Sequence, residues 1–443
     1  MKRSIKFILV VGLLVATSLS ACEGLPFELP WQVNEIPTPT QPPDENGELT
    51  PTPEATPQVE ETPPPVTSLT VWVPPEMDPD LETEASALFV NQLDAFSDAN
   101  GGIEIEVRVK AASGAGGLLD ALTASSSAAP GTLPDVIALA RPDLETAALK
   151  GLIYSLDGLT ESPDDPDWYG FAREMALIQG SSYGLPFAAD AMALVYRPEI
   201  IPDLPQTWSV LFEQEDDDEK IVLAFPADHD QALYLMNMYL AEGGALQDSQ
   251  RRPLLEVEPL TQVYRIIEEG VIAGVFPDYL NQYQTSGQVW AAFQDEQVDL
   301  AVTWASNFLK ENPTDANLVP LFPGSENTVA LGTGISWALA TPEVHRHTLA
   351  VALAEFLVQP DYLAAWTRAA GYIPSRPSSL EGWQNQSIRT TVSQIALMTQ
   401  LRPPNDVIMS LGPILREGNR QVLQGLVDPA QAAQLAIESL GDL

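Results

Sequence analysis

The chain has 443 residues, of which 61 are Asp or Glu and 21 are Lys or Arg, giving a formal net charge of −40 at pH 7. A surface this acidic repels the phosphate backbone of nucleic acids, so nucleic acid is not expected as a partner. Cys22 is the only cysteine, which excludes an intrachain disulfide, and the chain is long enough for two domain-sized cores.

Residues 1–21 predict an export signal, because a cationic start is followed by an apolar run over residues 7–16 and then by small residues before Cys22. The run is too short to span a bilayer, which needs about 20 apolar residues. Residues 19–22 resemble the bacterial lipobox, in which the cysteine is acylated and becomes the first residue. We expect an extracytoplasmic protein anchored through lipid on Cys22. An ordinary secretory signal with an incidental cysteine is the alternative.

Residues 22–68 form a Pro/Thr/Glu-rich segment, and no Lys or Arg occurs in it. Such a composition buries too little apolar surface to fold. Its proline density favours extended polyproline II, so we expect a semi-rigid spacer between the membrane and the folded part. A docking site for a proline-binding module is the alternative.

The folded part begins with a β-α-β-α-β pattern. Residues 69–73 form a short apolar strand, and a helical apolar face follows over residues 81–96. Residues 103–109 alternate strictly, as a half-exposed strand does, and a helix over 118–127 leads to a buried strand at 134–140. Strands separated by helices predict an α/β fold with a parallel sheet that helices cover on both faces.

A second α/β unit is expected after residue 189, and the last hundred residues are helical in pattern. Two such units leave a ligand cleft between them. The strands of this second part are expected at residues 192–196, 221–225, 298–303 and 335–340, with helices at residues 231–241 and 260–269.

Four passages together resemble a known family. They are residues 69–73 with the following helix and residues 100–105; residues 133–137; residues 183–197 with 204–208; and residues 371–376. The order of these passages resembles the extracellular solute-binding proteins of ABC importers, in particular the carbohydrate-binding group that includes the maltodextrin receptors. The resemblance covers the chain after the linker.

This resemblance implies a two-lobed periplasmic-binding-protein-like fold of type II, in which the lobes close on a ligand by a hinge motion. Lobe 1 is expected to contain residues 69–189 and 335–372, and lobe 2 residues 190–334 and 373–443. The implied partners are a small solute, expected to be a sugar or an oligosaccharide, and the transmembrane subunits of an ABC permease.

Tryptophans near strand ends are candidate sugar-binding residues, because sugar rings stack on aromatic planes. Trp72 and Trp304 lie at or near predicted strand ends, where ligands bind in α/β sheets. For Trp72, a place in the core is the alternative. Trp304 lies at the stacking position that the family resemblance implies.

Asp190 is the sharpest polar candidate, because it stands in an otherwise apolar strand. An unpartnered carboxylate there would cost several kcal/mol of desolvation, so it needs ligand hydroxyls or an internal cation such as Arg197. The resemblance implies an acidic residue that binds sugar at this place. Glu76 and Arg141, in loops after strand ends, and Tyr372 complete the predicted ligand-binding set.

No catalytic residue, metal or cofactor is predicted. The histidines, His229, His345 and His347, lack the spacing of a convincing metal site. We therefore expect a non-enzymatic receptor, on the periplasmic or outer face of a membrane. The alternatives are an exported glycan-degrading enzyme, a surface adhesion module, and a receptor for an amino acid, a peptide or a polyamine.

Overall fold

The computed structural model describes residues 65–213, 220–322, 324 and 327–441. Cys22, the predicted signal segment and most of the predicted linker lie outside these residues. Within the described ranges, no helix is both long and apolar enough to cross a membrane.

The first lobe contains the predicted parallel strands. Strand β1 (Ser68–Val73) pairs in parallel with β2 (Glu104–Val109) and with β3 (Val136–Ala140). Helix α1 (Glu84–Ala99) connects the first two strands, and α2 (Leu118–Ala128) precedes β3. The β-α-β-α-β pattern predicted from the sequence is confirmed here.

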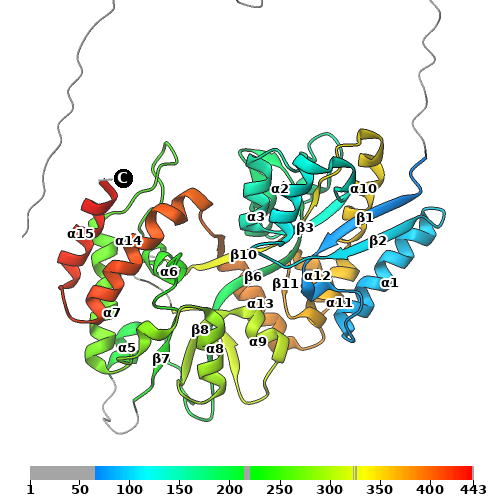
Figure 1. The fold of residues 1–443 in the computed structure, drawn as a ribbon. Helices are drawn as coiled ribbons and strands as arrows, with labels where there is room; N and C mark the ends of the chain where they lie inside the picture. Colours follow the sequence, from blue (N-terminus) through cyan, green and yellow to red (C-terminus); the bar gives the residue numbers. More distant parts are fainter. Residues whose placement is uncertain (1–64, 214–219, 323, 325–326, 442–443) are drawn as a thin grey trace, which may run out of the picture. The chain divides into compact units, whose positions relative to one another are not determined.

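Two long strands connect the lobes. Strand β6 (Leu185–Tyr196) pairs antiparallel with β10 (Ala330–Leu339), and the main sheet has the order β2-β1-β3-β10-β6-β8-β7. The first half of β6 pairs with β10, whereas its second half pairs with β8 (Leu300–Trp304). Both strands therefore run from one lobe into the other (Figure 1). The predicted lobe borders at residues 189/190 and 334/335 fall inside these continuous strands.

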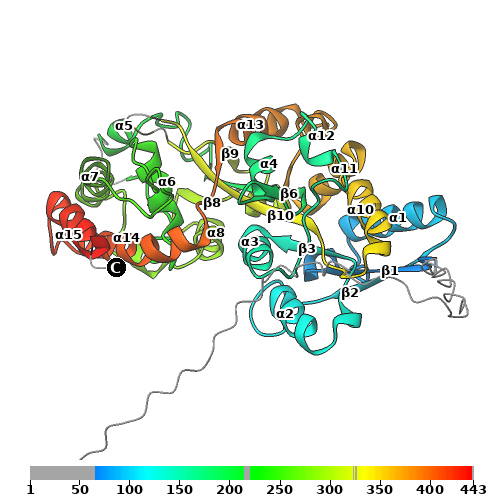
Figure 2. The same ribbon diagram turned by 90° about the horizontal axis from the view of Figure 1, so that it is seen from above.

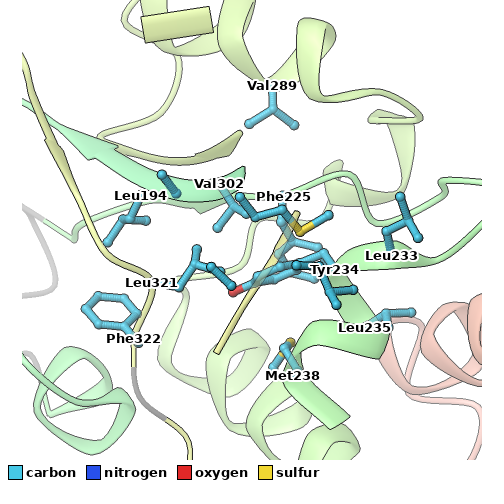
Figure 3. Close-up of a cluster of buried hydrophobic side chains, with 14 of the residues drawn as sticks. Leu194, Phe225, Leu233, Tyr234, Leu235, Met238, Val289, Val302, Leu321 and Phe322 are labelled. Carbon is cyan, nitrogen blue, oxygen red and sulfur yellow. The ribbon is translucent and has the colours of Figure 1, made fainter. Parts of the chain in front are cut away.

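The second lobe is built around β8 and the short strand β7 (Leu223–Ala224), which is shorter than the strand predicted at residues 221–225. Its helices include α6 (Leu233–Ala241), α7 (Val257–Ala273), α8 (Ser286–Gln294) and α9 (Ala305–Glu311). Figure 3 shows part of its core, in which Phe225 and Tyr234 pack near Leu194 of β6 and Val302 of β8. The ring centroids of Phe225 and Tyr234 are 4.9 Å apart.

The C-terminal part is helical, as predicted. Its helices are α10 (Val344–Phe356), α11 (Pro360–Ala370), α12 (Pro377–Glu381), α13 (Gln386–Met398), α14 (Asn405–Leu423) and α15 (Pro429–Gly441). Helices α10 and α11 pack on the first lobe, whereas α14 and α15 pack against α7 of the second (Figure 1). The chain therefore passes between the lobes again, through β12 (Thr399–Leu401), which pairs with β10.

Candidate functional site

Asp190 lies in β6 at the point where this strand passes from one lobe to the other. Only 7% of the residue is exposed. Its Oδ1 accepts hydrogen bonds from the backbone N–H groups of Ala191, at 2.9 Å, and Ser306, at 3.0 Å. Burial raises the pKa of the carboxyl to about 6, while the hydrogen bonds from Ser306 and the charge of Lys310 oppose the rise. The carboxyl is thus held by α9 of the second lobe.

Arg197, the example of an internal cation that was the alternative to a ligand for Asp190, has other contacts. Its Nε lies 3.0 Å from Asp315 Oδ2, and its guanidinium lies over the ring of Phe293. Ala191 and Ser306, instead of the guanidinium of Arg197, are therefore the hydrogen-bond partners of the Asp190 carboxyl.

Trp304 ends β8 and is half-buried. It pairs in register with Met192, two residues after Asp190 in β6. Alternate residues of a strand share a face, and directly opposed residues of an antiparallel pair point to the same side. The backbone register therefore places the indole on the Asp190 face of the sheet.

Two residues of the first lobe, Tyr372 and Glu76, lie near this place, and Tyr372 contacts Lys310 of α9. The Tyr372 ring is stacked on the buried Trp366, and Lys310 Nζ donates to its hydroxyl at 3.4 Å. Burial raises the pKa of Tyr372, and the negative charges of Glu76 and Asp190 add to the rise. The structure thus groups the predicted residues Glu76 and Asp190 around Tyr372.

Lys310 was not predicted from the sequence. It lies on α9 one turn after Ser306, the residue that holds Asp190. In the helix that directly follows the predicted Trp304, Lys310 lies four residues after Ser306, and residues four apart share a helix face. That spacing is the signal that could have identified it.

Trp72 does not join this group. Only 2% of it is exposed, and its ring packs in a core cluster with residues such as Ile137 and Leu118. Lys110 Nζ lies 4.3 Å from its ring centroid. Trp72 therefore lies in the core, which was the alternative to a ligand-binding position. It is buried there because helices cover both faces of β1.

Arg141 lies elsewhere. It is the first residue of α3 (Arg141–Leu149), it is buried, and its Nη1 lies 3.1 Å from Glu145 Oε2. The start of α14 lies next to it, since Asn405, the first residue of α14, donates from Nδ2 to the carbonyl of Pro142, the residue after Arg141, at 2.8 Å. Five of the six predicted ligand-binding residues thus lie near the lobe boundary or the crossing strands, in two groups.

Two hollows are present in the described structure. One of about 740 Å³ is lined by α9, α11 and the start of α13, and it includes Lys310. Another of about 600 Å³ lies between α1 and β2. Asp190 and Tyr372 line neither. Among residues 65–213, 220–322, 324 and 327–441, no group of three or more His, Cys, Asp or Glu side chains could hold a metal ion.

The chain is similar to known binding proteins in sequence and in fold. Residues 91–391 match the model of a family described as bacterial extracellular solute-binding proteins. A maltotriose-binding protein of Pyrococcus abyssi is 23% identical over 254 residues, 54% of each chain, so the match spans about half the length of that relative.

Solved structures share the fold at low identity. A cyclic α-maltosyl-1,6-maltose-binding protein of Arthrobacter globiformis has a TM-score of 0.69 at 16% identity. A sugar-binding protein of Xanthomonas citri has a TM-score of 0.68 at 17% identity. Each comparison covers 85% of this chain and 98% of the other. These similarities support the two-lobed α/β fold of type II.

Proposed function

Because the chain belongs to the family of bacterial extracellular solute-binding proteins, we propose that it is the receptor of an ABC importer for a sugar or an oligosaccharide. The solute is captured between the lobes and handed to the permease, without being chemically changed. Similar proteins support the choice of solute, since one binds maltotriose and one was solved with maltotetraose. A receptor of this kind shifts from an open to a closed population when the solute binds.

The observation that carries the proposal is the position of Trp304 on the same face of the crossing strands as Asp190. An aromatic plane stacks on the apolar face of a sugar ring, while a buried carboxylate accepts hydrogen bonds from its hydroxyls. Glu76 and Tyr372, from the first lobe, complete a set of groups contributed by both lobes. A solute held by both lobes stabilises the closed form.

Calorimetric titration of the purified protein tests the proposal. The panel contains glucose, maltose, maltotriose, cyclic maltodextrins and uronic acids, together with amino acids, short peptides and polyamines. We expect binding to at least one sugar and an X-ray scattering profile that becomes more compact with it. Tight binding to an amino acid, peptide or polyamine, with no binding to any sugar, would show that the solute class is different.

The Trp304→Ala variant is expected to bind the sugar at least about tenfold more weakly, because aromatic anchors at the centre of a site carry a large share of the affinity. Trp304→Phe should retain part of it. Trp208→Ala is a matched control, since Trp208 is also half-buried but packs against Phe276 and Phe322. Equal losses in the Trp304 and Trp208 variants would count against a stacking role.

Lipid anchoring through Cys22, which lies outside the described residues, is part of the same proposal. The Cys22→Ser variant is expected to move from the membrane fraction to the soluble fraction while its solute affinity, measured by titration, stays unchanged. Cells that carry it should lose uptake, because the receptor is no longer kept near the permease. A variant that remains in the membrane fraction would contradict anchoring at this residue.

A further inference from the structure

Two buried arginines lie close to the crossing strands, outside the Asp190 group. Arg141 begins α3, and Arg402 follows β12, three residues before α14. Asn405 at the start of α14 ties the two segments together, since its backbone N–H donates to Glu145 Oε1 at 3.0 Å and its amide donates to Pro142 O. Figure 2 shows the start of α14 approaching α3.

Arg402 is also linked through the backbone to the strands that carry Asp190. Its N–H donates to the carbonyl of Gly332 in β10 at 2.8 Å, which closes the end of β12 on β10. Gly332 in turn pairs with Ala191, the neighbour of Asp190 in β6. Arg402 therefore lies across β10 from Asp190, at the same level of the crossing strands.

Both guanidinium groups are buried and incompletely partnered. Arg402 is 5% exposed and Arg141 is 7% exposed. Within the described part of the chain, the Nε atoms of both arginines have no hydrogen-bond partner, and the carboxylate of Glu145 forms an ion pair with Arg141. A buried cation without a partner is costly, unless an anion from outside the chain completes its contacts.

The carboxylates of Glu145 and Asp143 act on the charge of Arg402 without forming an ion pair with it. Burial lowers the pKa of Arg402 to about 10, and the like charge of Arg141 adds to the effect, while Glu145 and Asp143 oppose it. Burial also raises the pKa of Asp143, against the attraction of Arg402. In a chain with a net charge of −40, two buried arginines that repel each other are an unusual arrangement.

The second lobe contributes a donor to the same region. Burial lowers the pKa of His229, in the loop after β7; Asp230 opposes this change, and Arg402 and Arg416 add to it. His229 Nδ1 accepts the backbone N–H of Gln231 at 3.0 Å, which leaves Nε2 as the nitrogen that can donate. Polar groups from both lobes thus lie near Arg402.

We propose that Arg402, together with Arg141, forms a subsite for a carboxylate group of the solute, so that the preferred sugar is acidic, such as a uronate. This inference rests on the proposed function. A planar guanidinium matches a carboxylate through two parallel hydrogen bonds. The nearby carboxylates of Asp143 and Glu145 disfavour a dianionic phosphate more than a singly charged carboxylate.

Titration of the full-length protein with matched neutral and acidic sugars tests the subsite. The probes are glucose and maltose against glucuronic acid, galacturonic acid and their disaccharides. We expect the acidic sugars to bind at least about tenfold more tightly than neutral sugars of the same size, because each bidentate carboxylate contact is charge-assisted. The Arg402→Gln variant should lose that preference and keep its affinity for the neutral sugars.

Two further variants separate binding from folding. Arg402→Lys keeps the charge but not the paired geometry, so it should recover only part of the affinity. Arg416→Gln is the matched control, because Arg416 lies on α14 but pairs with Asp228 nearer the surface. The affinities of this variant for neutral and acidic sugars should equal those of the parent protein. Thermal unfolding of each variant shows whether a loss of binding is a loss of folded protein.

The outcomes distinguish the two proposals. Tight binding of neutral sugars, with no preference for acidic ones and no effect of Arg402→Gln, would overturn the subsite and leave the receptor proposal standing. Binding of no sugar at all would overturn both. Inorganic phosphate that binds in an Arg402-dependent way, without competition from acidic sugars, would assign the pair to a free oxyanion instead and overturn the carboxylate assignment.

Discussion

Replacing Arg346 by alanine is expected to lower the free energy of unfolding by about 3–5 kcal/mol, because it leaves a buried carboxylate without its cation. Arg346 Nε lies 2.6 Å from Asp135 Oδ1, and Nη2 lies 2.7 Å from Oδ2. The Asp135 side chain is only 3% exposed. This paired geometry raises the pKa of Arg346 and keeps it charged.

The same ion pair holds three elements of the first lobe together. Asp135 Oδ2 accepts the backbone N–H of Thr70 in β1 at 2.8 Å, and Arg346 of α10 also donates to the carbonyl of Ser68. Loss of the guanidinium therefore removes the contacts that fix α10 against the start of β1, in addition to leaving the carboxylate unpaired.

Denaturant unfolding of the variant and of a matched control measures the effect. Arg368→Ala removes a surface arginine of α11 whose partner is Glu84, and both side chains are largely exposed. A surface pair contributes about 0–1 kcal/mol, so this control should unfold nearly as the parent does. Similar losses in the two variants would show that the Asp135 pair is no stronger than a surface pair.

The Arg346 pair also illustrates what local sequence patterns leave out. The alternation at residues 103–109 and the apolar run at 69–73 predicted β2 and β1, because the period of a strand is local information. The partner of Asp135 lies 211 residues further along the chain. A local pattern cannot contain such a contact. The passage at residues 133–137 therefore carries the family resemblance, but it does not reveal that Asp135 in this passage pairs with Arg346.

The candidate site shows the same division. Asp190 was identifiable because a carboxylate stood in an apolar strand. Its partner Ser306 binds it through the backbone N–H and the side chain, but Ser306 lies 116 residues further along the chain, so no local pattern connects the two. Arg402 lies in a short polar segment between helical patterns and was not singled out. Trp72 was placed near a ligand by its strand-end position, which does not reveal that helices cover it.

The Asp190→Asn variant is expected to be more stable than the parent at pH 7 by about 1–3 kcal/mol. The folded-state pKa of Asp190 is about 6, raised by burial, against an unfolded value of 3.8. Between these values the native state binds the proton more tightly, so the contribution of this carboxyl to stability is greatest below about pH 4 and falls as the pH rises to about 6. Asparagine keeps the Oδ1 acceptor without the charge, so its advantage should vanish near pH 4.

Unfolding of both proteins by denaturant between pH 4 and pH 7.5 measures this difference. Asp315→Asn is the control, because Asp315 is an exposed carboxylate whose partner, Arg197, lowers its pKa. That change should not stabilise the protein at pH 7. An Asp190→Asn variant that is less stable than the parent at every pH would mean that the ionised carboxylate is better compensated than its burial suggests.

The same substitution is expected to weaken solute binding by at least about tenfold, because hydrogen bonds from solute hydroxyls to a carboxylate are stronger than those to an amide. Hydroxyl donors favour the ionised form, so binding should lower the pKa of Asp190 and release a proton near pH 6. Calorimetry in two buffers of different ionisation enthalpy measures this release, which the Asn variant should lack. In a binding role, the charge of Asp190 lowers the stability of the empty protein, and solute hydroxyls compensate this charge when the solute binds. Binding without proton release would argue against this role.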